Sequence, residues 1–281
     1  YKVKTKICRI TYMIAELLMN EINVPDDDCA VLLSGGVDSI SVGFAAERLG
    51  KKVHAYSFCL DTHSSYDFQK AKEVAEIFNW PFTGIEVPTK NLAEDWHRLV
   101  QLDCRKKTHF ECVYPFLYVY PEIKQKYVLS GWAADGYYGI SKKAQIHYKH
   151  TQELFDKFRD NYFSPEMCAG YNWHKSVADD HDKVFVTPYL TEPVKEFFYS
   201  KSWDEVNKPF QKHHVRNAFD EFKKIGKIKN HLNWQIDSGI VNLFESLLPN
   251  KEINFKNRSR IMDVCRDWHV LNTIKANSNT L

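Results

Sequence analysis

The stretch CAVLLSGGVDS, from Cys29 to Ser39, decides the fold. Its first half is a short, continuous apolar run, the pattern of a strand that is buried on both faces of a parallel sheet. Its second half is a glycine-bearing turn that leads into a helical pattern. Two glycines let the backbone approach an anion closely, and the following helix adds its positive end. The sequence therefore predicts a phosphate-binding turn that lacks the lysine of a GxxxxGK[ST] loop.

Strand and helix patterns alternate on the carboxyl side of this turn. A helix is expected over about 39–49, ended by Gly50, and an amphipathic helix over about 6–21 precedes the turn. Further strands are expected over 51–60, 81–87 and 127–129. This alternation predicts an α/β fold with a doubly wound parallel sheet, in which ligands bind beyond the carboxyl ends of the strands.

The pattern divides the chain into five expected parts. These are an N-terminal helix over 1–28, a nucleotide-binding α/β core over 29–140, a polar insertion or lid outside the core over 141–183, a mostly helical part over 184–270, and a frayed tail over 271–281. The insertion is expected to close over the site and exclude water.

Composition excludes several classes of protein. The 281 residues are 44% hydrophobic and 26% charged, as in a globular protein, and the net charge of +2 gives no overall attraction to nucleic acid. Seven cysteines with no CxxC pair argue against a disulfide framework and a structural zinc site, so we expect reduced thiols and a cytoplasmic location. The sequence contains no apolar run of about 18 residues, so it predicts no membrane span.

Local basic and aromatic runs have ordinary interpretations. The basic runs over 142–150 and 223–229 are interpreted as solvated helix faces. The three bases over 105–107 either bind an anionic substrate group or form a solvated loop, and the residues do not decide between these. The aromatic run over 114–120 is expected to be core.

The turn SGGVDS resembles the PP-loop motif of the ATP pyrophosphatases, and about 30–248 resembles the synthetase domain of asparagine synthetases. The resemblance implies that the loop holds the β- and γ-phosphates of ATP, that Mg²⁺ assists, and that ATP is split between its α- and β-phosphates. The end of the second strand, Ser57 and Phe58, would contact the nucleotide. The residues that match the loop itself are Ser34, Gly35, Gly36, Val37, Asp38 and Ser39, with Asp38 bound to the metal.

A second match is SGWAADGYYG, residues 130–139, which resembles the signature SGEGADELFGG of the same family. By this resemblance Gly131 lies at the nucleotide and Asp135 is a metal ligand. Trp132 stands where the family has a catalytic glutamate, and Gly136 replaces a second acid. A substrate other than aspartate is therefore expected.

Later segments match the family more loosely. Residues 187–191, TPYLT, resemble its PFLD segment, with Thr191 in place of the aspartate. Lys212 and Arg216 resemble its K-x-x-x-R element. Lys227 and Lys229 precede QIDSGI, where the family carries a catalytic lysine that neutralises charge at the α-phosphate. Lys229 is preferred and Lys227 stays a candidate.

The resemblance predicts an AMP-forming ligase that adenylates an acyl group and transfers it to nitrogen. Too few residues precede the first strand for a glutaminase domain, so the expected nitrogen donor is ammonia, a substrate amine or a separate glutaminase subunit. One alternative is a PP-loop enzyme that modifies tRNA or a nucleobase, so nucleic acid remains a possible partner. The other is a non-catalytic nucleotide-binding module.

Overall fold

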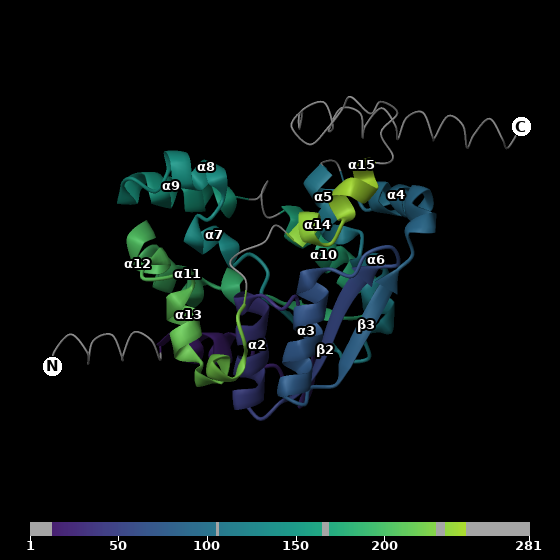
Figure 1. Cartoon of the computed structure of the whole chain (residues 1–281), viewed down its shortest axis with the longest axis horizontal. Coiled ribbons are helices and arrows are strands. Elements are labelled where there is room, and N and C mark those ends of the chain that lie inside the picture. Colours follow the sequence, from purple (N-terminus) through teal and green to yellow (C-terminus); the bar gives the residue numbers. More distant parts are fainter. Residues whose placement is uncertain (1–12, 105–106, 165–168, 229–233, 246–281) are drawn as a thin grey trace, which may run out of the picture.

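The protein is described by a computed structural model that covers residues 13–104, 107–164, 169–228 and 234–245 (Figure 1). Five strands form one sheet in the order β3-β2-β1-β4-β5, and every neighbouring pair is parallel. The strands are β1 (Asp28–Leu32), β2 (Lys52–Leu60), β3 (Phe82–Val87), β4 (Tyr127–Ser130) and β5 (Val184–Val186). The predicted α/β class with a doubly wound parallel sheet is confirmed.

The central strand β1 is buried on both faces. Cys29 and Val31 point into one hydrophobic cluster, whereas Ala30 and Leu32 point into the other. Because side chains alternate along a strand, a strand between two cores must be apolar at every position. This explains why the sequence reads as a continuous run.

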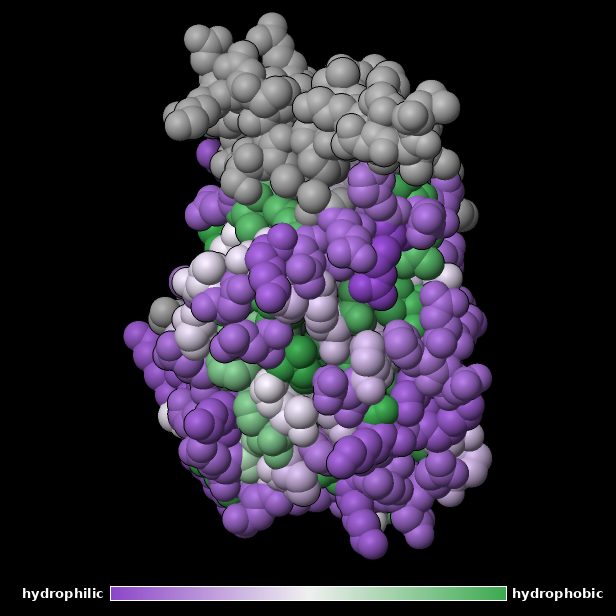
Figure 2. All heavy atoms as spheres, turned by 90° about the vertical axis from the view of Figure 1, so that its right-hand side faces the viewer, coloured by the Kyte–Doolittle hydropathy of each residue, from purple (hydrophilic) through white to green (hydrophobic). Residues whose placement is uncertain are grey.

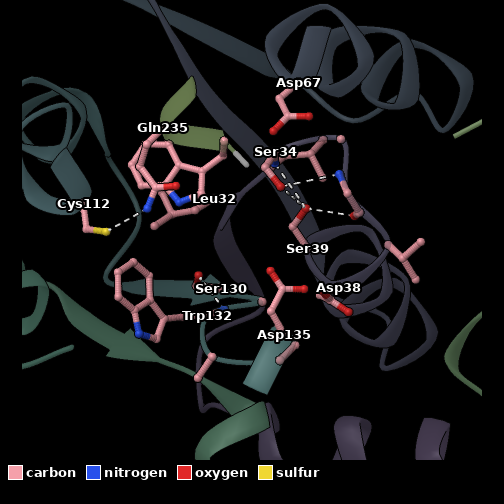
Figure 3. Close-up of a pocket in the computed structure, with 18 of the residues that line it drawn as sticks. Leu32, Ser34, Asp38, Ser39, Asp67, Cys112, Ser130, Trp132, Asp135 and Gln235 are labelled. Carbon is pink, nitrogen blue, oxygen red and sulfur yellow. Dashed lines mark hydrogen bonds between the residues drawn. The ribbon is translucent and has the colours of Figure 1, made fainter. Parts of the chain in front are cut away.

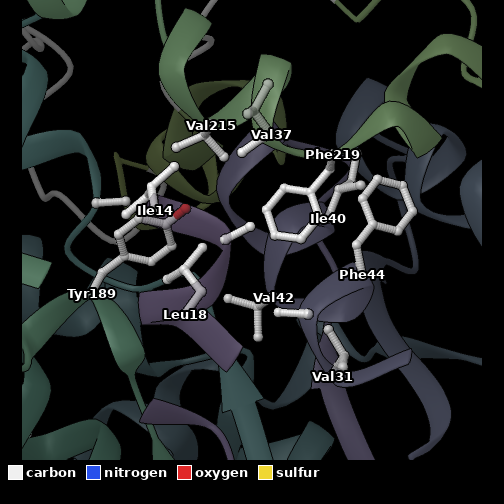
Figure 4. Packing of buried hydrophobic residues seen from close by; sticks show 14 of the residues in the cluster. Ile14, Leu18, Val31, Val37, Ile40, Val42, Phe44, Tyr189, Val215 and Phe219 are labelled. Atoms are coloured by element: carbon white, nitrogen blue, oxygen red, sulfur yellow. The ribbon is translucent and has the colours of Figure 1, made fainter. Parts of the chain in front are cut away.

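The first face of the sheet carries the larger cluster. Figure 4 shows Phe44 and Val42 of α2 packed with Phe219, Val215 and Tyr189, which lie far along the chain. The helices of this face are a helix over 13–21, α2 (Val37–Arg48), α3 (Tyr66–Ile77), α7 (Asp135–Tyr138), α11 (Glu192–Tyr199), α12 (Trp203–Asn207) and α13 (His213–Ala218), with the 3₁₀ turns η2 (Pro188–Leu190) and η3 (Asp220–Lys224).

The second face is rich in aromatic side chains. Tyr114 and Tyr120 are fully buried there, so the aromatic run of the sequence contributes to the core as expected. Trp96 stacks on Phe110 with the ring centroids 3.9 Å apart. The elements of this face are η1 (Thr89–Asn91), α4 (Leu92–Gln101), α5 (Lys107–Val113), α6 (Phe116–Glu122), α10 (Ala169–Asp180) and α15 (Ile240–Glu245).

The strand order places a topological switch beside β1. The chain passes from β1 to β2 and β3 on one side, and then crosses to β4 and β5 on the other. At such a point the loops that follow the two strands diverge and leave a crevice beyond their carboxyl ends. The glycine-bearing loops after β1 and β4 border this crevice.

Two regions differ from expectation. β5 was not predicted, because its three residues are too few for a periodic signal. Residues 141–183 were expected outside the core, yet Phe155 and Val177 are buried in the two clusters, so that interpretation is wrong. Polar residues dominate α8 (Lys142–His147), α9 (Gln152–Tyr162) and α10, so their few buried side chains give no clear periodic pattern in the sequence.

The surface that Figure 2 shows, on the side at the right of Figure 1, is mostly hydrophilic, with small hydrophobic areas between the polar side chains. Among the described residues no helix is both long and apolar enough to cross a membrane. Of the predicted N-terminal helix, 13–21 is helical and the earlier residues lie outside the described part.

Candidate functional site

The loops after β1 and β4 touch each other. A Cβ atom added to Gly131 would lie 2.6 Å from the backbone nitrogen of Ser39 and 2.7 Å from the carbonyl carbon of Asp38. No larger residue fits there without moving one of the loops. Gly131 therefore sets the distance between the two parts of the site.

The loop after β1 is a rigid turn that opens into α2. Gly35 has φ +70°, and a Cβ atom there would lie 2.7 Å from the Cβ of Lys70. The Ser34 backbone N–H donates to Ser39 Oγ, and the Ser39 hydroxyl donates to the Gly36 carbonyl, both at 3.1 Å. No side chain caps the start of α2. Its first-turn N–H groups and its dipole are therefore available to an anion in the crevice.

A lysine from the distant α13 region joins the two predicted carboxylates. Lys212 Nζ lies 2.5 Å from Asp38 Oδ2 and 2.7 Å from Asp135 Oδ1. Asp38 stands in the first turn of α2, and Asp135 is the first residue of α7. Lys212 itself has φ 61°, an uncommon backbone conformation for a residue with a side chain. Strain of this kind collects at functional sites.

Burial and mutual attraction set the charges of this group. Burial raises the pKa of Asp38 to about 6, although the neighbouring Lys212 ammonium acts to lower it. Burial lowers the pKa of Lys212, but the carboxylates of Asp135 and Asp38 outweigh burial and raise it above its ordinary value. Lys212 is therefore an ammonium ion, and its charge favours the ionised form of both acids.

Asp38 and Asp135 suit a magnesium ion. Asp38 Oδ1 is buried and has no hydrogen-bond partner within the described part of the chain, so this oxygen is available as a ligand. Over the same residues no cluster of three or more His, Cys, Asp or Glu forms a complete metal cage. Mg²⁺ characteristically uses one or two carboxylates and takes its other ligands from phosphates and water. The residues present fit that pattern.

A cavity of about 1020 Å³ lies over these loops. It is large enough for a nucleotide together with a second substrate. The sequence-predicted residues that line it are Ser34, Gly35, Gly36, Val37, Asp38, Ser39, Ser57, Phe58, Gly131 and Asp135. In Figure 3, Ser34 and Ser39 lie on one side of this cavity and Trp132 and Cys112 on the other, with Asp135 between them.

The two lysines expected near the α-phosphate are placed differently. Lys227 is exposed and does not line the cavity; its carbonyl accepts a hydrogen bond from the Tyr66 hydroxyl. Lys229 lies outside the described residues. The cation that does reach the carboxylates is Lys212, which the sequence indicates only through its resemblance to the K-x-x-x-R element. Arg216 of the same element also lines the cavity.

One of the comparisons with known proteins identifies a family for this chain. The family model described as asparagine synthase matches residues 19–224. No curated protein matches the chain. A solved structure from Methanocaldococcus jannaschii, described as a predicted subunit of tRNA methyltransferase, is similar at 14% identity and a TM-score of 0.32, over 73% of this chain and 99% of that one. That similarity is too low to support any argument. The family match covers well over half of the residues, so the chain belongs to the asparagine synthase family, within the PP-loop ATP pyrophosphatases.

Proposed function

We propose that this protein is an AMP-forming ligase, which adenylates a carboxylate with ATP and transfers the acyl group to ammonia or another amine. One observation carries the proposal. Two carboxylates from separate loops, Asp38 and Asp135, converge on one ammonium beside the uncapped start of α2. Cation and anion sites side by side are what pyrophosphate release requires.

Each residue has a role in the first step. The SGGVDS turn and the α2 N-terminus hold the β- and γ-phosphates of ATP. A substrate carboxylate oxygen attacks the α-phosphorus, the bond to the β-phosphate oxygen breaks, and pyrophosphate leaves. Asp38 and Asp135 would hold Mg²⁺, which neutralises charge on the leaving group. The Lys212 ammonium then donates to phosphate oxygens.

In the second step the amine attacks the acyl carbon of the adenylate, an amide bond forms, and AMP leaves with the bonding electrons. Water would destroy the adenylate, so exclusion of water matters. The cavity walls from α8 and α9, among them Lys143 and Tyr162, would help to exclude water. The nitrogen donor is proposed to be free ammonia, a substrate amine or a separate glutaminase subunit.

Product identity tests this function. Purified protein would be incubated with ATP, Mg²⁺, ammonium and a panel of carboxylic acids, and AMP, ADP, phosphate and pyrophosphate would be quantified. We expect AMP and pyrophosphate in equal amounts from the wild type and none from Asp38→Asn. ADP with phosphate would refute the proposal. Stimulation by RNA or a nucleoside and not by any acid would favour nucleobase modification, and ATP binding without products would favour a non-catalytic module.

A further inference from the structure

The cavity has an aromatic side that the phosphate chemistry does not use. Four rings, here called the aromatic recess, line it: Phe58, Phe116, Trp132 and Trp234. They come from four separate elements, namely β2, α6, the loop after β4, and α14 (Trp234–Asp237). Phe58 contacts Phe116 and Trp234 edge to face, with the ring centroids 5.9 and 6.0 Å apart.

Trp132 is held so that one face of its indole is covered. The His174 ring stacks on it with the centroids 5.2 Å apart and an angle of 15° between the planes. A Cβ atom added to Gly170 would lie only 3.3 Å from the indole Cζ2 atom. The indole is half-buried and lines the cavity, so its uncovered surface faces the space beside Asp135. Its orientation is set before any ligand binds.

The support behind the indole is itself buried and neutral. His174 is 0% exposed, and Phe116 and Phe185 contact its ring edge to face at 4.0 and 4.3 Å. Burial lowers the pKa of His174 to about 3, so the ring carries no charge at neutral pH. A fixed, uncharged support makes Trp132 a preformed stacking platform, which lowers the entropy cost of binding a flat ligand.

Two polar residues beside the recess, Cys112 and Gln235, are uncharged. Burial raises the pKa of Cys112 to about 12, and its sulfur accepts a hydrogen bond of 3.4 Å from Gln235 Nε2 (Figure 3). A second carboxylate or an ammonium group on a substrate would lose its hydration here without gaining a counterion from these residues. An uncharged apolar ring has no comparable hydration to lose, so it does not incur this cost.

We propose that the aromatic recess binds a planar, uncharged ring of the carboxylic acid that is activated, with Trp132 as its stacking platform. This inference rests on the proposed function and names its substrate class. Trp132 and Asp135 line the same cavity, so a carboxylate on a short linker would extend from the recess towards the proposed phosphate site. The family resemblance puts the nucleotide at Ser57 and Phe58, at the end of β2, so Phe58 would lie between adenine and the ring of the acid.

Direct binding tests the recess without turnover. Calorimetry with Mg²⁺ and α,β-methylene-ATP would compare 3-phenylpropanoate, its saturated analogue 3-cyclohexylpropanoate, and aspartate. We expect phenylpropanoate to bind about tenfold more tightly than either of the others. Trp132→Leu should weaken the binding of phenylpropanoate about tenfold, and Trp132→Phe should weaken it only about twofold. The control is Trp203→Leu, because Trp203 is a half-buried tryptophan outside the cavity. This substitution should leave the binding of phenylpropanoate unchanged.

Three results would overturn the inference: aspartate bound as tightly as phenylpropanoate, no preference for the planar ring, or Trp132→Leu weakening the ATP analogue as much as the acid. The last would place adenine in the recess. The two proposals fail separately. Recess binding without AMP formation keeps this inference and refutes the ligase, whereas AMP formation stimulated by aspartate alone keeps the ligase and refutes this inference.

Discussion

The loops after β1 and β4 occupy equivalent places at the switch point, yet they offer different kinds of groups to a ligand. The loop from Ser34 to Ser39 presents mainly backbone N–H groups and small side chains, and its shape follows from two glycines and a helix start. The loop from Ser130 to Gly139 keeps Gly131 and Asp135 but presents a large indole. Backbone recognition suits the invariant triphosphate, whereas side-chain recognition can change with the substrate.

The comparison is tested most strongly at the cation between the loops. Lys212→Met should lower the rate of AMP formation by about 10²–10³-fold, because both carboxylates lose their ammonium and the phosphates lose a donor. The rate would be measured at saturating ATP and Mg²⁺. Lys227→Met is the matched control; Lys227 is exposed outside the cavity and should change the rate less than about twofold. A larger loss of rate in Lys227→Met than in Lys212→Met would restore Lys227 as the catalytic lysine.

The contact between the loops gives the next largest effect. Gly131→Ala forces a Cβ atom against the backbone of Ser39, and a shift of about 1 Å in a reacting group costs about 100-fold in rate. The kcat for AMP formation would be compared with that of Gly226→Ala, whose Cβ atom would have its nearest neighbour at 3.8 Å. Equal rates for the two variants would show that the loop spacing does not matter.

The support behind Trp132 should give the protein acid sensitivity. The unfolded chain protonates His174 near its ordinary pKa of about 6.5, whereas burial lowers the pKa in the folded protein to about 3. Between these values the unfolded state binds more protons, so stability falls as the pH falls, by about 2 kcal/mol from pH 6.5 to 5.

His174→Phe should flatten the dependence of stability on pH over this interval, because phenylalanine keeps the stacked ring and removes the titrating group. Urea unfolding at several pH values would measure it, with near-UV circular dichroism to verify that the variant is folded. An unchanged slope over the same interval would rule out His174 as its source.

The smallest expected effect concerns the backbone of the loop after β4. Ala133 has φ 71°, a left-handed conformation that strains an alanine. Ala133→Gly relieves that strain but frees the unfolded chain, so we expect a net gain of roughly 0.5 kcal/mol in unfolding free energy. The adjacent Ala134 has φ −52° and is 1% exposed, and Ala134→Gly should instead cost about 1 kcal/mol. If both substitutions change the free energy of unfolding in the same direction, the backbone at Ala133 is not strained.

Much of the fold was predictable because its signals are local. A continuous apolar run and a glycine-bearing turn describe β1 and α2 within a dozen residues, and three other strands follow the same logic. β5 was missed because three residues give no period, and α9 was interpreted as part of an insertion because its buried side chains, Phe155 and Arg159, interrupt a polar surface.

The sequence by itself determined the glycine-bearing turn, the sheet class and the two carboxylates at the loops, because each depends on residues that are close neighbours in the chain. Only the tertiary structure decided which cation joins those carboxylates. Lys212 meets Asp38 across 174 positions, and no local pattern encodes such a contact. The same holds for His174 behind Trp132, whose stacking depends on how α10 packs against the sheet. Local propensity fixes elements, whereas burial and packing choose the side chains that meet at their ends.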